Sequence, residues 1–302
     1  MLIKSADDKS KRLALLLDLQ NSSRLDDWQK KRLGDELLKV RRGIQGEKDA
    51  AHYLDNHFID GKNHAVIHDL RLEVDGEIAQ IDHLLISRTL NFYMLETKNF
   101  AGDVTITSHG EFSVKYGAEK IYNIPSPIEQ SKRHENVLRR LLTKLDITGR
   151  AGVGLHFKHV VLVDPKAAIN RPNAKTFDTS MVIGADQFRT WHLAHVDKNI
   201  STADVLLSML NFKDTDSLRQ VAEKICRQHR PENLLHMPDW LQPQPAKSQK
   251  EVVASQAEQV GRKKLICLTC NGKISYEEGK FCWNNDKRFK DGQYCRAHQA
   301  EF

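Results

Sequence analysis

Apolar residues recur at helical spacing over the first part of the chain. The leucines between residues 10 and 42 predict helix, so we expect a helical N-terminal segment, 1–42. Gly43 and Gly46 then interrupt the pattern, and a second helical stretch begins at Glu47. We therefore expect two separate helices, one on each side of the two glycines.

The pattern changes to short strands between residues 64 and 117. Gly, Asp, Asn and Ser separate runs of apolar and β-branched residues, which is typical of antiparallel strands joined by turns. The predicted strands are at 64–73, 78–87, 91–100, 102–107 and 111–117.

A helix is expected after these strands. Ser126, Pro127 and Glu129 have the order of an N-cap, a first-turn proline and the acid of a capping box, and the helix should end near Leu145. The remainder of the domain is predicted to contain two strands and two helices, at 157–165, 180–188, 202–211 and 215–229.

A stretch with several prolines and glutamines and little apolar periodicity, 231–262, is interpreted as a linker. It separates a main domain, 43–230, from a C-terminal module, 263–302. The hydrophobic fraction of 40% is enough for a packed core, and the net charge of +6 suits a polyanionic partner without proving one. Because the chain has no long apolar run and no signal-peptide stretch, we expect a cytoplasmic protein with no membrane contact.

Two acids and a lysine lie inside the apolar hairpin "QIDHLLISRTLNFYMLETKNF". Side chains two apart on a strand share a face, so Glu96 and Lys98 point the same way. If the loop spans 87–91, Asp82 lies opposite Glu96 with Cβ atoms roughly 5 Å apart. A bound Mg²⁺ or Mn²⁺ would relieve the repulsion between these acids, and Lys98 would orient or help deprotonate a water. The alternative is a solvated face on which Lys98 pairs with one acid.

The hairpin also resembles a known family. "IDHLLIS…LETKNF" is similar to the core of the nuclease-related domain, which belongs to the PD-(D/E)xK nuclease superfamily. Asp82 matches the first acid of the motif, and Glu96 to Lys98 match its (D/E)-x-K element, although no proline precedes Asp82. The resemblance extends over about 43–145.

Two flanking segments agree with the resemblance. "GEKDAAHYL" is similar to the leading helix of the family, with Glu47 in its acidic position, and "PSPIEQSKRHENVLRRL" is similar to a later helix, with Gln130 and His134 in place. Glu47 and Gln130 would support the site. An acid in a first helical turn also complements the helix dipole, and a hydrogen-bonded core histidine is an equally good interpretation of His134.

The resemblance implies an α/β fold, a mixed sheet flanked by helices as in restriction-endonuclease-like cores. It also implies Mg²⁺-dependent cleavage of nucleic acid, for which we expect a DNA endonuclease. The opposite face of the later helix is basic, which suits either solvent or a phosphate backbone. Its residues are Lys132, Arg133, Arg139, Arg140 and Lys144.

Four cysteines are clustered near the C-terminus. Their spacing predicts a structural zinc site, for which we prefer four thiolates and keep a set with His298 in place of Cys282 as the alternative. A module with so little aliphatic content needs a metal in order to fold. The candidate ligands are Cys267, Cys270, Cys282, Cys295 and His298.

Three functions are compatible with these features. The preferred one is a metal-dependent nuclease with a zinc module for targeting, which binds DNA and whose module has a possible protein partner. The second is a non-catalytic nucleic-acid-binding or adaptor protein that retains the nuclease fold. The third is a zinc-organised scaffold for protein interactions. A homodimer is one option, because duplex cleavage often uses two copies.

Overall fold

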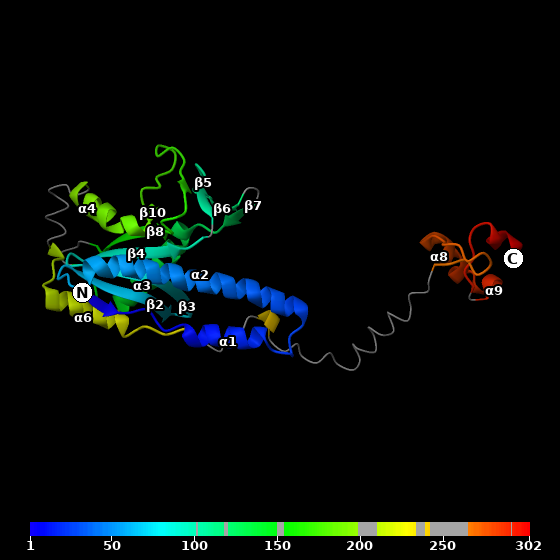
Figure 1. The fold of residues 1–302 in the computed structure, drawn as a ribbon, viewed down its shortest axis with the longest axis horizontal. Coiled ribbons are helices and arrows are strands. Elements are labelled where there is room, and N and C mark those ends of the chain that lie inside the picture. The colour runs from blue at the N-terminus through cyan, green and yellow to red at the C-terminus, as the bar shows by residue number, and fades with distance from the viewer. Residues whose placement is uncertain are drawn as a thin grey trace. The chain divides into compact units, whose positions relative to one another are not determined.

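The computed structural model describes residues 1–100, 102–117, 120–149, 154–198, 210–233, 239–241, 265–290 and 292–302. These residues fall into two compact units, Met1–His236 and Met237–Phe302 (Figure 1). Most of the predicted linker at 231–262 and of the predicted helix at 202–211 lies outside the described residues. None of the described helices is long and apolar enough to cross a membrane.

A mixed six-stranded sheet forms the centre of the first unit, in the order β1-β2-β3-β4-β8-β10. β2, β3 and β4 pair antiparallel, whereas β1 joins β2, β8 joins β4 and β10 joins β8 in parallel. The fold is thus the expected mixed sheet flanked by helices. The strands are β1 (Leu2–Lys4), β2 (His64–Val74), β3 (Glu77–Ser87), β4 (Asn91–Lys98), β8 (His156–Val163) and β10 (Val182–Gly184).

A smaller sheet has the order β7-β6-β5-β9. Apolar residues of its strands pack with Val161, Val163 and Val182 of the main sheet. The strand β7 was not predicted, because most of its side chains are exposed and show no alternation. The strands are β5 (Asp103–Ile106), β6 (Phe112–Tyr116), β7 (Lys120–Ile124) and β9 (Ile169–Asn170).

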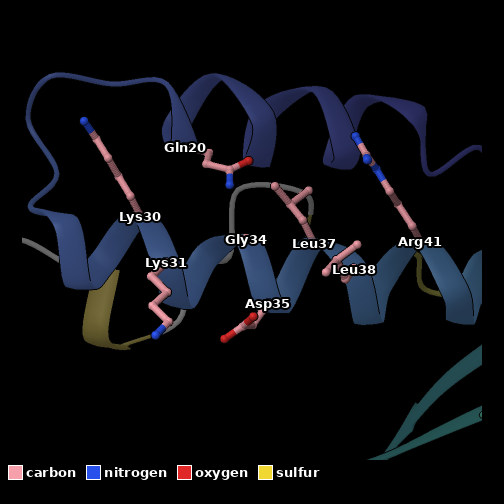
Figure 2. Close-up of a pocket in the computed structure, with 8 residues that line it drawn as sticks. All are labelled: Gln20, Lys30, Lys31, Gly34, Asp35, Leu37, Leu38 and Arg41. Atoms are coloured by element: carbon pink, nitrogen blue, oxygen red, sulfur yellow. The ribbon is translucent and has the colours of Figure 1, made fainter. Parts of the chain in front are cut away.

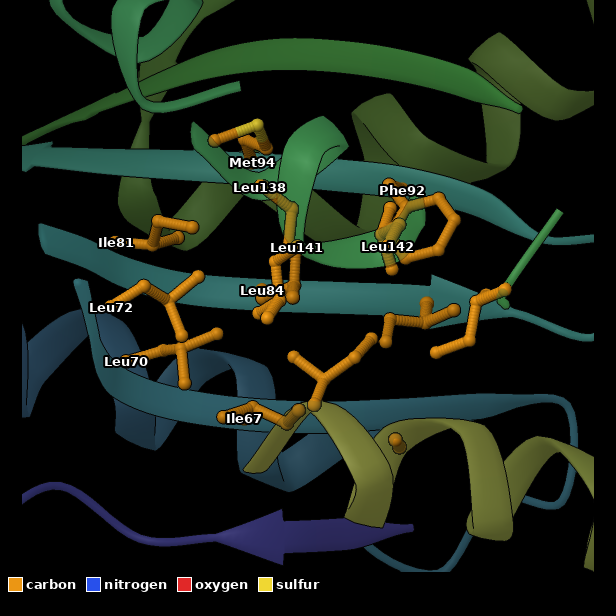
Figure 3. Close-up of a cluster of buried hydrophobic side chains, with 14 of the residues drawn as sticks. Ile67, Leu70, Leu72, Ile81, Leu84, Phe92, Met94, Leu138, Leu141 and Leu142 are labelled. Atoms are coloured by element: carbon orange, nitrogen blue, oxygen red, sulfur yellow. The ribbon is translucent and has the colours of Figure 1, made fainter. Parts of the chain in front are cut away.

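Helices cover both faces of the main sheet, because successive residues of its central strands are apolar on both sides. Leu84 and Phe92 pack under α3 (Pro127–Lys144) and α6 (Thr215–Cys226), as Figure 3 shows for α3. Leu85 packs on the other face with α2 (Asp27–Phe58) and with Phe188 at the start of α4 (Phe188–Lys198). The helix α1 (Ser10–Gln20) lies along the N-terminal half of α2 (Figure 1).

The N-terminus of α3 carries one half of the expected capping box. The Ser126 side chain accepts a hydrogen bond from the Glu129 backbone N–H at 3.4 Å, and Pro127 occupies the first turn. The Glu129 carboxylate, however, pairs with Lys132 at 2.7 Å. A complete capping box is found instead at the start of α2, between Asp26 and Gln29.

The expected helix break at the two glycines is wrong, since α2 is continuous from Asp27 to Phe58. Gly46 is buried against Asn99, which follows β4, and a Cβ at this position would overlap the Asn99 side chain. The glycine therefore permits a close approach between the helix and the end of β4. This packing outweighs the roughly 1 kcal/mol that a glycine costs within a helix.

We expect alanine at these two glycines to change stability in opposite directions. Gly46→Ala should lower the free energy of unfolding by about 1–3 kcal/mol, because the added methyl group overlaps Asn99. Gly43→Ala places its Cβ with nothing within 4 Å and should raise the free energy by about 0.5–1 kcal/mol through helix propensity. Urea unfolding followed by circular dichroism measures both changes. Shifts of the same sign would contradict the close approach at Gly46.

Candidate active site and metal cluster

The hairpin of β3 and β4 has the predicted register. Leu84 pairs with Met94 and Ile86 with Phe92, and the ladder continues to the pair of His83 and Leu95. Beyond this last pair, the backbone N–H of Thr97 on β4 donates to Asp82 Oδ2 on β3 at 2.7 Å. The carboxylate of Asp82 is therefore fixed at the point where the ladder ends.

Glu96, Lys98 and Gln130 are directly connected. Lys98 Nζ donates to Glu96 Oε1 at 2.7 Å and to Gln130 Oε1 at 3.2 Å. The Glu96 side chain is only 4% exposed, so the carboxylate of this ion pair is withdrawn from water, whereas the Lys98 side chain is 23% exposed. The structure thus brings the motif on β4 together with the predicted glutamine of α3.

Glu47 reaches the same site from the middle of α2. Because this helix begins far upstream at Asp27, the interpretation of Glu47 as a first-turn acid is wrong. Its Oε2 atom accepts a hydrogen bond from Lys9 Nζ at 2.7 Å. The stripe of Ala50, Leu54 and Phe58, which is buried, directs this face of the helix toward the sheet.

Two residues of the site were not predicted. Lys9 lies on the N-terminal strap, residues 5–9, which connects β1 to α1, and its Nζ is 3.5 Å from Asp69 Oδ1. Asp69 is buried in β2 at a left-handed φ of 53°, between the ladder pairs of His68 with His83 and of Leu70 with Ile81. The sequence contained a signal for Asp69, namely an acid within the apolar run "VIHDLRL".

The carboxylates of this site interact electrostatically. Burial raises the pKa of Asp82, and the negative charges of Glu96 and Glu47 raise it further. Burial also raises the pKa of Glu96, although Lys98 opposes this shift. For Lys9, burial acts to lower the pKa, but the neighbouring carboxylate of Glu47 outweighs it, and the pKa of Lys9 is raised.

The donor chemistry fits a hard divalent cation. When all four are ionised, the carboxylates of Glu47, Asp69, Asp82 and Glu96 outnumber the two ammonium groups, those of Lys9 and Lys98, by two charges. Mg²⁺ often binds through one or two carboxylates and keeps several waters. That mode suits this site, because no three of its carboxylates bring ligand atoms within 4.8 Å of one another. Among the described residues only a group of cysteines and a histidine in the second unit does so.

A buried hydrogen-bond chain supports the site from the other face of the sheet. Asp55 Oδ1 contacts His68 Nε2 at 3.1 Å, and the Nδ1 atoms of His68 and His83 lie 2.8 Å apart. His83 Nε2 then contacts Thr97 Oγ1 at 3.1 Å. Since the N–H of Thr97 binds Asp82, this chain fixes the backbone that orients the first acid of the motif.

His134 is half-buried on α3. Burial, together with the positive charges of Arg133 and Lys98, lowers the pKa of His134 to about 4. The imidazole is therefore neutral at physiological pH, in agreement with a histidine that packs beside the site.

The basic face of α3 is mostly neutralised by neighbouring acids. Lys132 pairs with Glu129 and Lys144 with Asp75, while Arg139 pairs with Glu135 and Arg140 with Glu77. These pairs favour the solvated-face interpretation. The N-terminal half of α2, residues 27–42, differs. Five of its basic residues have no carboxylate of a described residue within 4.0 Å, the limit for an ion pair. These are Lys30, Lys31, Lys39, Arg41 and Arg42.

A pocket of about 370 Å³ lies between α1 and α2. Figure 2 shows Lys30 and Arg41 extending from α2 toward α1 on either side of Leu37, with Gln20 of α1 facing them. The other lining residues are Lys31, Gly34, Asp35 and Leu38. Three of these five basic side chains, those of Lys30, Lys31 and Arg41, therefore line one pocket.

In the second unit, three cysteines and one histidine form a compact cluster. The ligand atoms of Cys267, Cys270, Cys295 and His298 all lie within 4.8 Å of one another. The structure does not bring Cys282 into this group, so the alternative set with His298 is the one that it assembles. Three sulfur atoms and one imidazole nitrogen fit tetrahedral zinc.

Cys282 has a structural environment instead. It is buried in α8 (Tyr276–Asn284), and its Sγ accepts hydrogen bonds from Tyr294 N and Gln299 Nε2, both at 3.4 Å. The aromatic residue Phe289 is also buried in this small core, whereas Phe281 is largely exposed. The irregular spacing around Cys282 was the signal that separates it from the ligands.

We expect serine substitutions to distinguish the cysteines that bind the metal from Cys282, which packs in the small core. Cys270→Ser should reduce the zinc content of the full-length protein from one ion per chain to none after dialysis, because it removes one thiolate of the cluster. Cys282→Ser should retain the ion. Metal analysis of both variants measures the zinc content. Loss of zinc in Cys282→Ser with retention in Cys270→Ser would contradict the Cys/His set.

A family model supports the assignment of the first unit. The model of the nuclease-related domain matches residues 42–163, a stretch that contains Glu47, Asp82, Glu96, Lys98 and Gln130. The match supports membership of that family for this part of the chain, and with it a nuclease-related function. Neither a curated protein nor a solved structure matches the chain. The N-terminal strap and the Cys/His cluster lie outside the matched residues.

Proposed function

We propose that this protein is a metal-dependent nuclease that hydrolyses phosphodiester bonds, and that its substrate is DNA, cleaved internally. The observation that carries this proposal is the convergence of Asp82, Glu96, Lys98 and Gln130 from three neighbouring elements within the matched family segment. Carboxylates that are buried at an energetic cost, beside an amine held in place, are typical of a catalytic site.

The metal would be held by Asp82 and Glu96, with Mg²⁺ or Mn²⁺ as the ion. When bound, such an ion polarises a phosphoryl oxygen and lowers the pKa of a bound water. The Thr97 N–H and the buried hydrogen-bond chain keep Asp82 in place for this role. Glu47 would act from α2 as a further acid beside the ion.

Lys98 would position the attacking water or bind a phosphate oxygen. Among the described contacts, its ammonium group uses two of its three N–H donors, on Glu96 and Gln130. These two acceptors fix the direction of the remaining donor. Gln130, through its amide, would hold Lys98 and bind the substrate backbone.

A second candidate function is a non-catalytic nucleic-acid-binding protein. The observation that favours it is that Lys98 pairs with Glu96, and Lys9 with Glu47, so that ammonium groups already neutralise part of the acidic site. Binding of nucleic acid without cleavage under any divalent ion would support this function. In either case we propose that the Cys/His module binds structural zinc and serves in targeting.

We expect cleavage to depend on the acids of the motif. Purified protein with supercoiled plasmid and Mg²⁺ or Mn²⁺ should nick the DNA, and chelator should abolish the nicking. Asp82→Asn, Glu96→Gln and Lys98→Met should each lower the rate roughly 10²-fold or more, because each removes a charge from the reacting site. Glu129→Gln, at an exposed acid of α3, is the matched control and should retain the rate. Wild-type protein that leaves plasmid and oligonucleotides intact with both ions would contradict the nuclease proposal.

We expect the basic part of α2 to carry most of the contact with the phosphate backbone. Combined alanine substitutions of Lys39, Arg41 and Arg42 should lower the slope of log K against log salt by about two to three, because roughly one phosphate contact is lost per residue. Fluorescence anisotropy with a labelled DNA duplex in chelator measures the slope. The control combines alanine at Lys132 and Lys144, whose side chains are already paired, and should change the slope little. Equal effects of the two sets would contradict the assignment.

A further inference from the structure

The N-terminal strap adds a cation to the candidate active site from outside the matched family segment. Lys9 is the last residue of this strap, whereas the family match begins at residue 42. Its Nζ lies 2.7 Å from Glu47 Oε2 and 3.5 Å from Asp69 Oδ1, and its side chain is 28% exposed. Lys9 thus contacts two carboxylates from different elements, unlike a surface ion pair on one helix.

The position of the strap is fixed independently of Glu47. Lys4 Nζ donates to the backbone carbonyls of His68 and Asp69 at 3.1 and 3.0 Å. The Asp7 N–H donates to Asp69 Oδ2 at 3.1 Å, and Asp7 Oδ2 contacts His229 Nε2 at 2.9 Å. β1, which precedes the strap, also pairs with β2. The chain is therefore held against β2 from β1 through Asp7, two residues before Lys9.

The charges of the site explain what this ammonium group does. With Lys98 as the sole cation, the carboxylates of Glu47, Asp69, Asp82 and Glu96, when all are ionised as metal ligands require, would leave an excess of three negative charges. Such an excess would attract more than one divalent ion, as in sites that hold two metals. Lys9 reduces the excess to two, which one divalent ion neutralises.

We propose that Lys9 is a resident cation that takes the place of a second divalent ion beside Glu47 and Asp69, so that the site binds one divalent ion, at Asp82 and Glu96. The inference rests on the proposed function only in assigning the metal to these two acids. In a two-metal site the second ion helps to stabilise a substrate oxygen. Here the ammonium group of Lys9 supplies positive charge to a phosphate oxygen on the side of the site near Glu47.

Counting bound Mn²⁺ tests the inference without any substrate. Electron paramagnetic resonance of full-length, zinc-loaded protein, titrated with Mn²⁺, gives the number of bound ions and their Kd. The wild type should bind one ion, which the combined Asp82→Asn and Glu96→Gln substitutions remove. Lys9→Met should bind two, and its first ion should bind roughly tenfold more tightly, because a nearby positive charge is gone.

Two control variants separate the position of Lys9 from its charge. Lys48→Met removes a lysine from the exposed face of α2 next to Glu47 and should bind one ion, as the wild type does. Lys9→Arg keeps the positive charge and should also bind one ion. Circular dichroism of each variant establishes that it is folded, and Lys9→Gln replaces Lys9→Met if the latter is not.

The outcomes are distinct from those of the cleavage assay. One ion in Lys9→Met with a Kd within twofold of the wild-type value overturns the inference, as does a wild-type count of two or of none. If the counts follow the expectation but plasmid is not cleaved, the role of Lys9 in metal stoichiometry stands and the nuclease proposal fails. If cleavage occurs while Lys9→Met matches the wild type, the nuclease stands and the inference fails.

Discussion

Carboxylates that lie largely buried on the central strands of a hydrophobic sheet require nearby cations, and this requirement organises the first unit. Asp69, Asp82 and Glu96 come from three neighbouring strands, and burial raises the pKa of both Asp82 and Glu96. Apolar side chains at these positions would cost far less free energy. The chain instead retains the acids and surrounds them with two lysines and a backbone N–H, which is the arrangement expected where function outweighs stability.

The surrounding structure keeps these acids in place through contacts that lie outside the motif. Gly46 allows α2 to approach Asn99 closely, and this approach brings Glu47 to the end of β4. On the other face of the sheet, two buried histidines connect Asp55 to Thr97, whose N–H binds Asp82. The site therefore depends on helix packing and on a buried polar network as much as on the strands that carry its charges.

The sequence predicted the parts of the site that follow from local periodicity. The alternation of apolar residues and the short loop sufficed for the register of Leu84 with Met94, whereas Gln130 was expected at the site from the family resemblance. The strap was missed, because Lys9 meets Glu47 only through tertiary structure and nothing near Lys9 in the sequence indicates it. Asp69 was overlooked although its signal is local, an acid in an apolar strand.

Two errors have a similar physical origin. Glycines usually end helices because of their conformational freedom, but at Gly46 the decisive property is the missing side chain, which only the position of Asn99 reveals. Likewise, cysteine spacing identified the Cys/His cluster but not its fourth member. Whether Cys282 or His298 completes the set depends on the direction in which α8 presents its sulfur, toward Tyr294 and Gln299.

The segments outside the family match therefore control the charge of a site whose acids lie inside it. The matched residues 42–163 supply the acids, Lys98 and Gln130, whereas the strap supplies Lys9. The N-terminal half of α2 supplies the basic side chains that no described acid neutralises, on the same helix as Glu47. The two candidate functions differ in whether a divalent ion binds at Asp82 and Glu96 beside these ammonium groups. In the proposed role of Lys9, the excess of acids over lysines sets this balance, so a change in the strap alone is expected to alter how many divalent ions the core binds.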